Sequence, residues 1–238
     1  MTYSSGEDPS VDSISTRAVQ RFARLREAAV SGRDSVPIAE PAPGWCVSAL
    51  ARIMRNSSSL LPLIGELQRR VSTIGEMYPY PSESLHLSLL GLTQREETPP
   101  NAERVAAIIQ AVEPAVRKAT TVLVQAGRVN MIGNQLFIEV IPSRDSWANL
   151  RLSLDKVVRA IGEDPISYAD PEPMHLNIGR LLSPPNGDRL KAALTDESLA
   201  VDHEFGLTTV EIVTTDFVLT PSTLQVWREI PLGTARAS

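Results

Sequence analysis

Two of the three histidines in this chain of 238 residues lie in short segments that alternate apolar and polar residues. His86 is in Leu-His-Leu-Ser-Leu, and His175 is in Met-His-Leu-Asn-Ile. If each segment is a strand, successive side chains point to opposite faces, so one face is apolar and the other polar. Each polar face then pairs an imidazole with a hydrogen-bonding side chain, Ser88 in the first segment and Asn177 in the second. A neutral and a protonated imidazole together can act as general base and general acid near neutral pH.

A structural role is the alternative for each histidine, because imidazoles on half-buried strands commonly pack without taking part in chemistry. Two matching segments in one chain favour a shared functional site instead. The third histidine, His203, has no partner of this kind, and we expect it in an exposed loop.

The apolar periodicity predicts the order strand-helix-strand-helix-strand twice along the chain. The first round has strands at residues 45–54, 84–92 and 121–130, with helices at 58–74 and from 101 onward. The second has strands at 135–141, 174–181, 206–219 and 223–230, with helices at 146–161 and 187–198. Pro114 should kink or end the helix in which it lies. This order predicts an internal duplication that places the two histidine strands in equivalent positions.

The segments outside the two rounds differ from them in composition. Residues 1–43 predict a disordered N-terminus, a helix at 13–30 and a Pro-rich linker. Residues 44–233 predict one bilobal domain, and residues 234–238 a tail. The N-terminal helix could dock on the domain, cover its cleft or contact a partner, and a packed appendage is the simplest of these interpretations.

The two histidine segments resemble the motifs of the 2H phosphoesterase superfamily, which includes bacterial 2′-5′ RNA ligase and cyclic phosphodiesterase enzymes. Residues 85–91 (Leu-His-Leu-Ser-Leu-Leu-Gly) are similar to its first motif, and residues 174–180 (Met-His-Leu-Asn-Ile-Gly-Arg) to its second. Residues 219–233 resemble its closing pair of strands, so the resemblance covers about residues 44–233.

The resemblance implies an α/β (α+β) fold with two pseudo-symmetric lobes, antiparallel sheets that line a central cleft, and helices outside. It also implies a phosphodiesterase that needs neither metal nor cofactor. Such an enzyme hydrolyses a 2′,3′-cyclic phosphate or a 2′-5′ phosphodiester of a nucleotide or RNA end. His86 and His175 would be the catalytic acid and base, and which histidine has which role stays open.

Several side chains near the two motifs are candidates for binding this substrate. Ser88 and Asn177 can donate hydrogen bonds to phosphate oxygens. Arg180 could hold a phosphate, although strand alternation places it opposite His175 unless Gly179 marks a bulge. Three tyrosines in the Pro-rich loops before the histidine strands could stack on a base: Tyr78, Tyr80 and Tyr168.

Asn177 departs from the Thr or Ser that the superfamily usually has at this position. Because an amide is longer than a hydroxyl, the geometry at the phosphate would shift. One alternative is therefore a module that binds a nucleotide or RNA end with weak or no turnover. Another is an RNA-end ligase that runs the same chemistry in reverse.

Composition excludes several other classes of protein. The net charge of −5 and an aromatic content of 5% disfavour binding of a long nucleic-acid duplex or an extended base-stacking platform. No apolar run is long enough to span a membrane, and the polar N-terminus is not a secretory signal. The single cysteine, Cys46, cannot form an internal disulfide, which fits a cytoplasmic protein. We expect a monomer.

Overall fold

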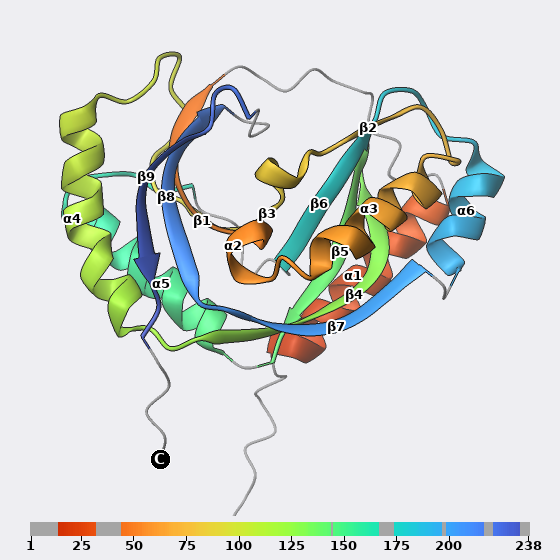
Figure 1. The fold of residues 1–238 in the computed structure, drawn as a ribbon, viewed down its shortest axis with the longest axis horizontal. Coiled ribbons are helices and arrows are strands. Elements are labelled where there is room, and N and C mark those ends of the chain that lie inside the picture. The colour runs from red at the N-terminus through yellow and green to blue at the C-terminus, as the bar shows by residue number, and fades with distance from the viewer. Residues whose placement is uncertain are drawn as a thin grey trace, which may run out of the picture.

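The computed structural model describes residues 14–31, 44–143, 145–166, 174–196, 199–216 and 221–233 (Figure 1). Its helices are α1 (Ile14–Val30), α2 (Ile53–Asn56), α3 (Leu60–Val71), η1 (Ser82–Ser84), α4 (Ala102–Lys118), α5 (Ser146–Ala160) and α6 (Gly187–Thr195). Its strands are β1 (Trp45–Arg52), β2 (Met77–Pro79), β3 (His86–Gly91), β4 (Val122–Ile132), β5 (Gln135–Pro142), β6 (Met174–Leu181), β7 (Ala200–Leu207), β8 (Thr209–Asp216) and β9 (Gln225–Pro231).

The strands form two antiparallel sheets, one in each lobe. The first has the order β3-β1-β8-β9, and the second has the order β2-β6-β5-β4-β7. If the edge strand β2 is left out, the second order becomes β6-β5-β4-β7, which matches β3-β1-β8-β9 strand by strand. The histidine strands β3 and β6 therefore occupy equivalent positions. The two rounds exchange a strand: β4 joins the sheet of the second round, and β8 joins the sheet of the first. The expected two-lobed α/β fold with antiparallel sheets is confirmed.

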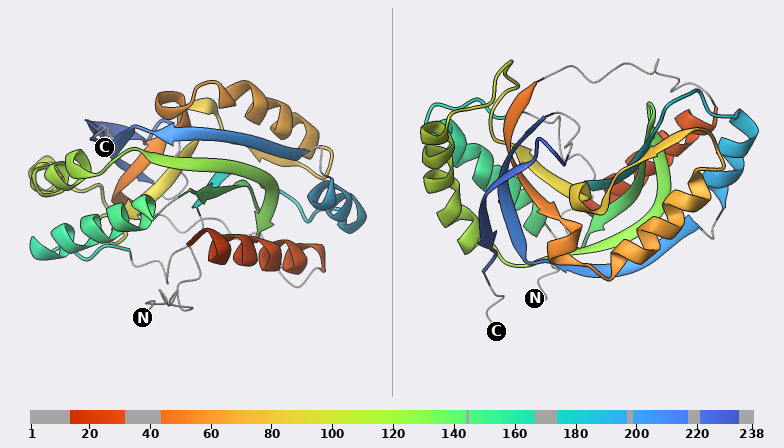
Figure 2. Two further views of the ribbon diagram at one scale, coloured as in Figure 1. Left: turned by 90° about the horizontal axis from the view of Figure 1, so that it is seen from below. Right: turned by 45° about the horizontal axis from the view of Figure 1, so that its top comes forward.

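Helices cover the sheets on their apolar faces. The helices α4 and α5 pack against each other and contact the first sheet, whereas α3 and α6 contact the second. Apolar stripes on these helices join the alternating apolar residues of the strands in one buried core. The N-terminal helix α1 lies on the opposite side of the second sheet from α3 (Figure 2). The second sheet is therefore covered on both faces.

The expected single strand at residues 206–219 is wrong. Residues 206 and 207 end β7, residues 209–216 form β8, and residues 217–219 lie outside the described residues. β7 pairs with β4 in one sheet, and β8 pairs with β1 in the other. The chain crosses between the sheets at Thr208, and apolar pattern alone does not show such a crossing. His203 accordingly lies half-buried in β7, where its ring stacks on Phe205 with 6.4 Å between centroids. The expectation of an exposed loop at this histidine is also wrong.

Two further differences concern prolines. The Pro-rich segment before the first histidine strand contains the short strand β2, which pairs with β6 at the sheet edge, where proline is tolerated. Tyr78 therefore lies in a strand and not in a loop.

Helix α4 begins after the Asn101 cap, whose side chain accepts a hydrogen bond from the Arg104 amide at 2.9 Å. It continues through Pro114 to Lys118, because the buried face that includes Val116 continues past the proline.

None of the helices in the described part of the chain is long and apolar enough to cross a membrane.

Candidate active site

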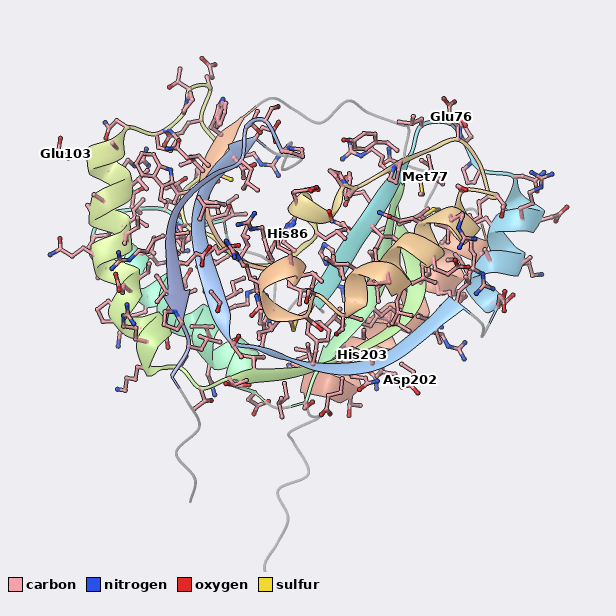
Figure 3. The ribbon with its side chains drawn as sticks, viewed as in Figure 1. Glu76, Met77, His86, Glu103, Asp202 and His203 are labelled. Carbon is pink, nitrogen blue, oxygen red and sulfur yellow. The ribbon has the colours of Figure 1, made fainter. Side chains whose placement is uncertain are left out.

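The tertiary structure brings the two histidine strands into contact. Although His86 and His175 are far apart in the sequence, β3 and β6 lie against each other where the two lobes meet. The two imidazoles are close enough for the charge of His175 to lower the pKa of His86. Figure 3 places His86 near the middle of the molecule, whereas His203 lies on β7 at its rim. The fold therefore brings the predicted pair together where the two lobes meet, and His203 lies apart from it.

The two ring nitrogens of His86 have different partners. Nδ1 lies 2.6 Å from the carbonyl oxygen of Ser84, and Nε2 lies 3.0 Å from the hydroxyl of Ser88. A carbonyl oxygen only accepts, so Nδ1 carries a proton and donates it to Ser84. In the neutral ring, Nε2 is then the acceptor, and the Ser88 hydroxyl donates to it. The geometry confirms that His86 and Ser88 share one face of β3.

Burial lowers the pKa of His86 from its ordinary value to about 4. The bond to the Ser84 carbonyl opposes this shift, whereas the charges of His175 and Arg52 add to it. At neutral pH, His86 is therefore neutral, with an unprotonated Nε2. This is the state that a general base requires.

His175 lies half-buried on the polar face of β6. Its ring makes an edge-on contact with Phe137 of β5, with 5.5 Å between centroids. Its cross-strand partner on β5 is Glu139, and that of Asn177 is Phe137. Alternation along β5 and β6 places these four side chains on the same face of the second sheet.

Each histidine strand carries a one-residue bulge directly after its polar pair. In β3, Ser88 pairs with Leu50 and Leu90 with Ala49. In β6, Asn177 pairs with Phe137, and Gly179 pairs with Leu136, the next residue along β5. The bulge in β6 inverts the alternation, and Arg180 therefore lies on the same face as His175. Without the bulge, Arg180 would point to the opposite face.

Gly179 allows the edge strand β2 to approach this bulge. A Cβ atom at this position would lie 2.9 Å from the sulfur of Met77 and 3.0 Å from the carbonyl oxygen of Tyr78. The first neighbour is flexible, but the second is backbone, so a larger residue would push β2 away. Because Tyr78 is the cross-strand partner of Arg180, this approach brings the tyrosine to the site face.

Tyr80 and Arg180 are joined by a hydrogen bond from the guanidinium to the phenol oxygen. Burial raises the pKa of Tyr80, and the positive charge of Arg180, together with this bond, partly offsets that effect. Tyr78 packs edge-on against Tyr80, with 5.9 Å between ring centroids, and is 48% exposed. The three side chains form a polar and aromatic cluster beside the second histidine motif. Tyr168, the third tyrosine candidate, lies outside the described residues.

Two buried polar atoms of the second motif have no hydrogen-bond partner among the described residues. They are Oδ1 of Asn177 and Nε of Arg180. Buried polar atoms in folded proteins are nearly always paired, so each unpaired one calls for a partner such as a water molecule, an ion or a ligand. Both side chains belong to the set predicted from the sequence to hold phosphate, but only Nε of Arg180 is itself a donor to a phosphate oxygen; in Asn177 that donor is the amide nitrogen.

Behind His86, on the same face of the first sheet, lies a buried ion pair that the sequence did not lead us to expect. Arg52, the cross-strand partner of His86, donates two hydrogen bonds to Glu211, at 2.5 and 2.6 Å, and Glu211 is fully buried. The exposed Arg55 extends the cluster by pairing with Glu229 at 2.9 Å. A signal was present, since Glu211 and Glu139 are single charges inside otherwise apolar or β-branched runs. Such a charge in a buried strand needs a partner.

The other residues considered from sequence have structural surroundings. Cys46 is buried in β1, and burial raises the pKa of its thiol, which makes it a poor nucleophile. Trp227 packs partly buried against the core and donates from Nε1 to the Thr214 hydroxyl at 2.9 Å. Within the described ranges, no three His, Cys, Asp or Glu side chains gather as metal ligands would.

The fold and this site define a two-lobed α/β protein in which paired histidine strands meet between two antiparallel sheets. The amino-acid sequence matches no protein-family model and no curated protein. Solved structures share the fold, however. TT0787 of Thermus thermophilus superposes with a TM-score of 0.59 at 14% identity, over 80% of this chain and 100% of that one.

Two more solved structures extend the comparison. Escherichia coli LigT in complex with 3′-AMP gives a TM-score of 0.53 at 12% identity, over 80% of this chain and 98% of LigT. A structure described as a phosphoesterase gives 0.50 at 14% identity, over 79% of this chain and 98% of its own. These similarities confirm the fold that the resemblance to the 2H phosphoesterase superfamily implied.

Proposed function

We propose that this protein is a phosphodiesterase that uses His86 as general base and His175 as general acid. Its substrate is a 2′,3′-cyclic phosphate, or a related 2′-5′ phosphodiester, at the end of a nucleotide or RNA. The observation that supports this most directly is the bond from Nδ1 of His86 to Ser84, since it leaves Nε2 as the basic atom. LigT, which has the same fold, was solved with the nucleotide 3′-AMP, in agreement with such a ligand.

The proposed reaction is an in-line displacement at phosphorus. Nε2 of His86 takes a proton from water, and the oxygen of that water forms a new bond to phosphorus. The bond from phosphorus to the 2′ or 3′ oxygen breaks, and protonated His175 gives its proton to that leaving oxygen. One P–O bond forms and one breaks, and proton exchange with water then returns both histidines to their starting states. Proton transfer through each histidine contributes about 10²–10⁴ to the rate.

Four further side chains have proposed roles in binding the substrate. When Nε2 of His86 turns to water, the Ser88 hydroxyl is released to donate to a non-bridging phosphate oxygen. The amide of Asn177 donates to the second such oxygen, and Arg180 binds the phosphate through its guanidinium. Tyr78 stacks on the base, held edge-on by Tyr80. Tyr168 stays a candidate for the same role from the sequence resemblance.

A binding module with weak or no turnover is the second candidate, because Asn177 stands where the superfamily usually has a hydroxyl. The amide oxygen of Asn177 is a buried acceptor without a partner among the described residues, so it can accept a hydrogen bond from a donor group of a ligand. The two candidates differ in turnover and not in ligand.

To test this proposal, the 238-residue protein is incubated with the four 2′,3′-cyclic nucleoside monophosphates, with and without EDTA. His86→Ala and His175→Ala are assayed beside it, and short RNAs with cyclic-phosphate or 2′-5′ ends follow. EDTA-resistant turnover that is lost in both variants supports the proposal, provided that both still bind the nucleoside monophosphate product. Binding without turnover in the parent protein would favour the binding module. Turnover that survives both substitutions would overturn the two-histidine mechanism.

A further inference from the structure

The two histidines have buried cross-strand partners of opposite charge. His86 lies opposite Arg52 on β1, and His175 lies opposite Glu139 on β5. Directly opposed residues of an antiparallel pair have Cβ atoms about 4.5–5.5 Å apart, so their side chains interact. A cation beside His86 disfavours its protonated form, whereas an anion beside His175 favours it. Strand pairing thus gives the two rings opposite electrostatic surroundings.

Glu139 is buried, with 6% of its surface exposed, and its partners come from two other elements. Arg26 of α1 donates to Oε1, and the amide nitrogen of Asn130 on β4 donates to the same atom at 2.7 Å. Burial raises the pKa of Glu139, while the charges of Arg26 and Arg128 and both hydrogen bonds lower it. Arg26 and Asn130 therefore offset part of the cost of burying a carboxylate opposite His175.

Helix α1 also reaches the second histidine through an apolar contact. Phe22 packs on Phe137 with 6.0 Å between ring centroids, and Phe137 in turn contacts the ring of His175. The amide of Asn130 donates to the carbonyl oxygen of Phe22 at 2.9 Å, which fixes the helix on the sheet. The helix precedes both rounds of the duplication, yet it packs on the sheet face that carries His175.

We propose that Glu139 is a positioning residue that keeps His175 protonated, and that Arg26 of α1 sets the strength of this effect. The inference rests on the proposed function, in which His175 donates a proton. The Glu139 carboxylate stabilises the imidazolium, and the guanidinium of Arg26 attenuates that stabilisation by neutralising part of the charge. Helix α1 thereby tunes the acid half of the site without touching the substrate.

Other charged groups also lie near this pair, among them Arg180, which the bulge in β6 places on the same face as His175. His86 faces His175 from β3, and Arg128 faces Glu139 from β4. Arg52 lies on β1 beside His86, and its charge is matched by Glu211. None of these groups changes in the variants below, so they form a constant background.

The test follows the imidazole ring signals of the full-length chain by NMR across pH. Only three histidines contribute, and His203 on β7 is an internal reference. Glu139→Gln keeps a hydrogen-bond acceptor for Asn130 but removes the charge, so the apparent pKa of His175 should fall. Arg26→Met keeps much of the apolar stem but removes the cation, so the upper apparent pKa of the His175–Glu139 pair should rise. Arg24→Met removes an exposed arginine of the same helix and should change neither.

The proposal is supported if the apparent pKa falls in Glu139→Gln and rises in Arg26→Met. A merely structural disturbance of α1 would move the pKa in the same direction in both variants. Restoration of the parent pKa by Arg26→Lys would support it further. Displacements of the same sign, or none in either variant, would overturn it. Since the titration needs no turnover, this outcome is separate from that of the proposed function. If the protein turns over substrate, the alkaline limb of its pH–rate profile should shift in the same directions as these pKa values. On that limb, a shift of one pH unit changes the rate tenfold.

Discussion

Nδ1 of His86 lies 2.6 Å from the carbonyl oxygen of Ser84, a contact that only a protonated Nδ1 can make favourably. Because burial also lowers the pKa of His86 to about 4, the ring is neutral at physiological pH with Nε2 as its basic atom. We expect kcat/KM for a 2′,3′-cyclic nucleotide to fall on the acid side with an apparent pKa near 4. An ordinary histidine would give an acid limb near 6.5. The pH profile between about pH 3.5 and 9 measures this difference.

The same shift has a consequence for stability. Between about pH 6.5 and 4, His86 binds more protons in the unfolded chain than in the folded one. The free energy of unfolding should therefore decrease as pH falls through this window. His86→Gln should remove part of that decrease, as urea denaturation at several pH values would show. An acid limb at 6.5, together with an unchanged pH dependence of stability in His86→Gln, would contradict a neutral His86.

Asn177 is expected to contribute one hydrogen-bond donor to the phosphate in the transition state. Asn177→Ala should lower kcat by about 10²-fold or more, as the loss of one such donor does in other enzymes. Asn177→Thr restores the hydroxyl that is usual in the superfamily and should retain most of the activity. Steady-state kinetics of the two variants provide the measurement. If Asn177→Thr creates turnover that the parent lacks, the parent is the binding module and not the enzyme.

Arg180 and Tyr80 are expected to act together in binding. Arg180→Ala should raise KM about tenfold or more, because it removes the guanidinium that holds the phosphate. Tyr80→Phe keeps the ring but removes the phenol oxygen that accepts from Arg180, and a smaller rise in KM is expected. If Tyr80 acts only through Arg180, Tyr80→Phe should add nothing in the Arg180→Ala background. Additive effects on KM would indicate independent roles.

The ion pair behind His86 should matter for stability and not only for catalysis. Arg52→Ala would leave Glu211 fully buried without its bidentate partner, so we expect a loss of about 3–5 kcal/mol in unfolding free energy. Arg55→Ala is the comparison variant: its side chain is half exposed, it pairs with Glu229 at 2.9 Å, and it approaches Glu211 only at 4.0 Å, so we expect a loss of about 1 kcal/mol or less. Thermal and urea denaturation of both variants test the contrast. Equal losses would show that burial of Glu211 is not decisive.

Strand alternation predicted from the sequence which residues share a face within one strand. His86 with Ser88, and His175 with Asn177, follow directly from period-two alternation, and β6 has the predicted bounds at Met174–Leu181. Alternation alone did not show on which face of β6 Arg180 lies. The bulge after Asn177 determines the face on which Arg180 lies, and this bulge is visible only in the register in which β6 pairs with β5.

The two histidine motifs, their polar neighbours and the two rounds of elements could be recognised in the sequence, because local periodicity records which side chains face a core. Which buried charge lies opposite each histidine, and the packing of α1 beside His175, became clear from the folded protein. The same holds for the assignment of β7 and β8 to different sheets. These features depend on pairing between strands and helices distant in sequence, and a local pattern carries no information about such partners.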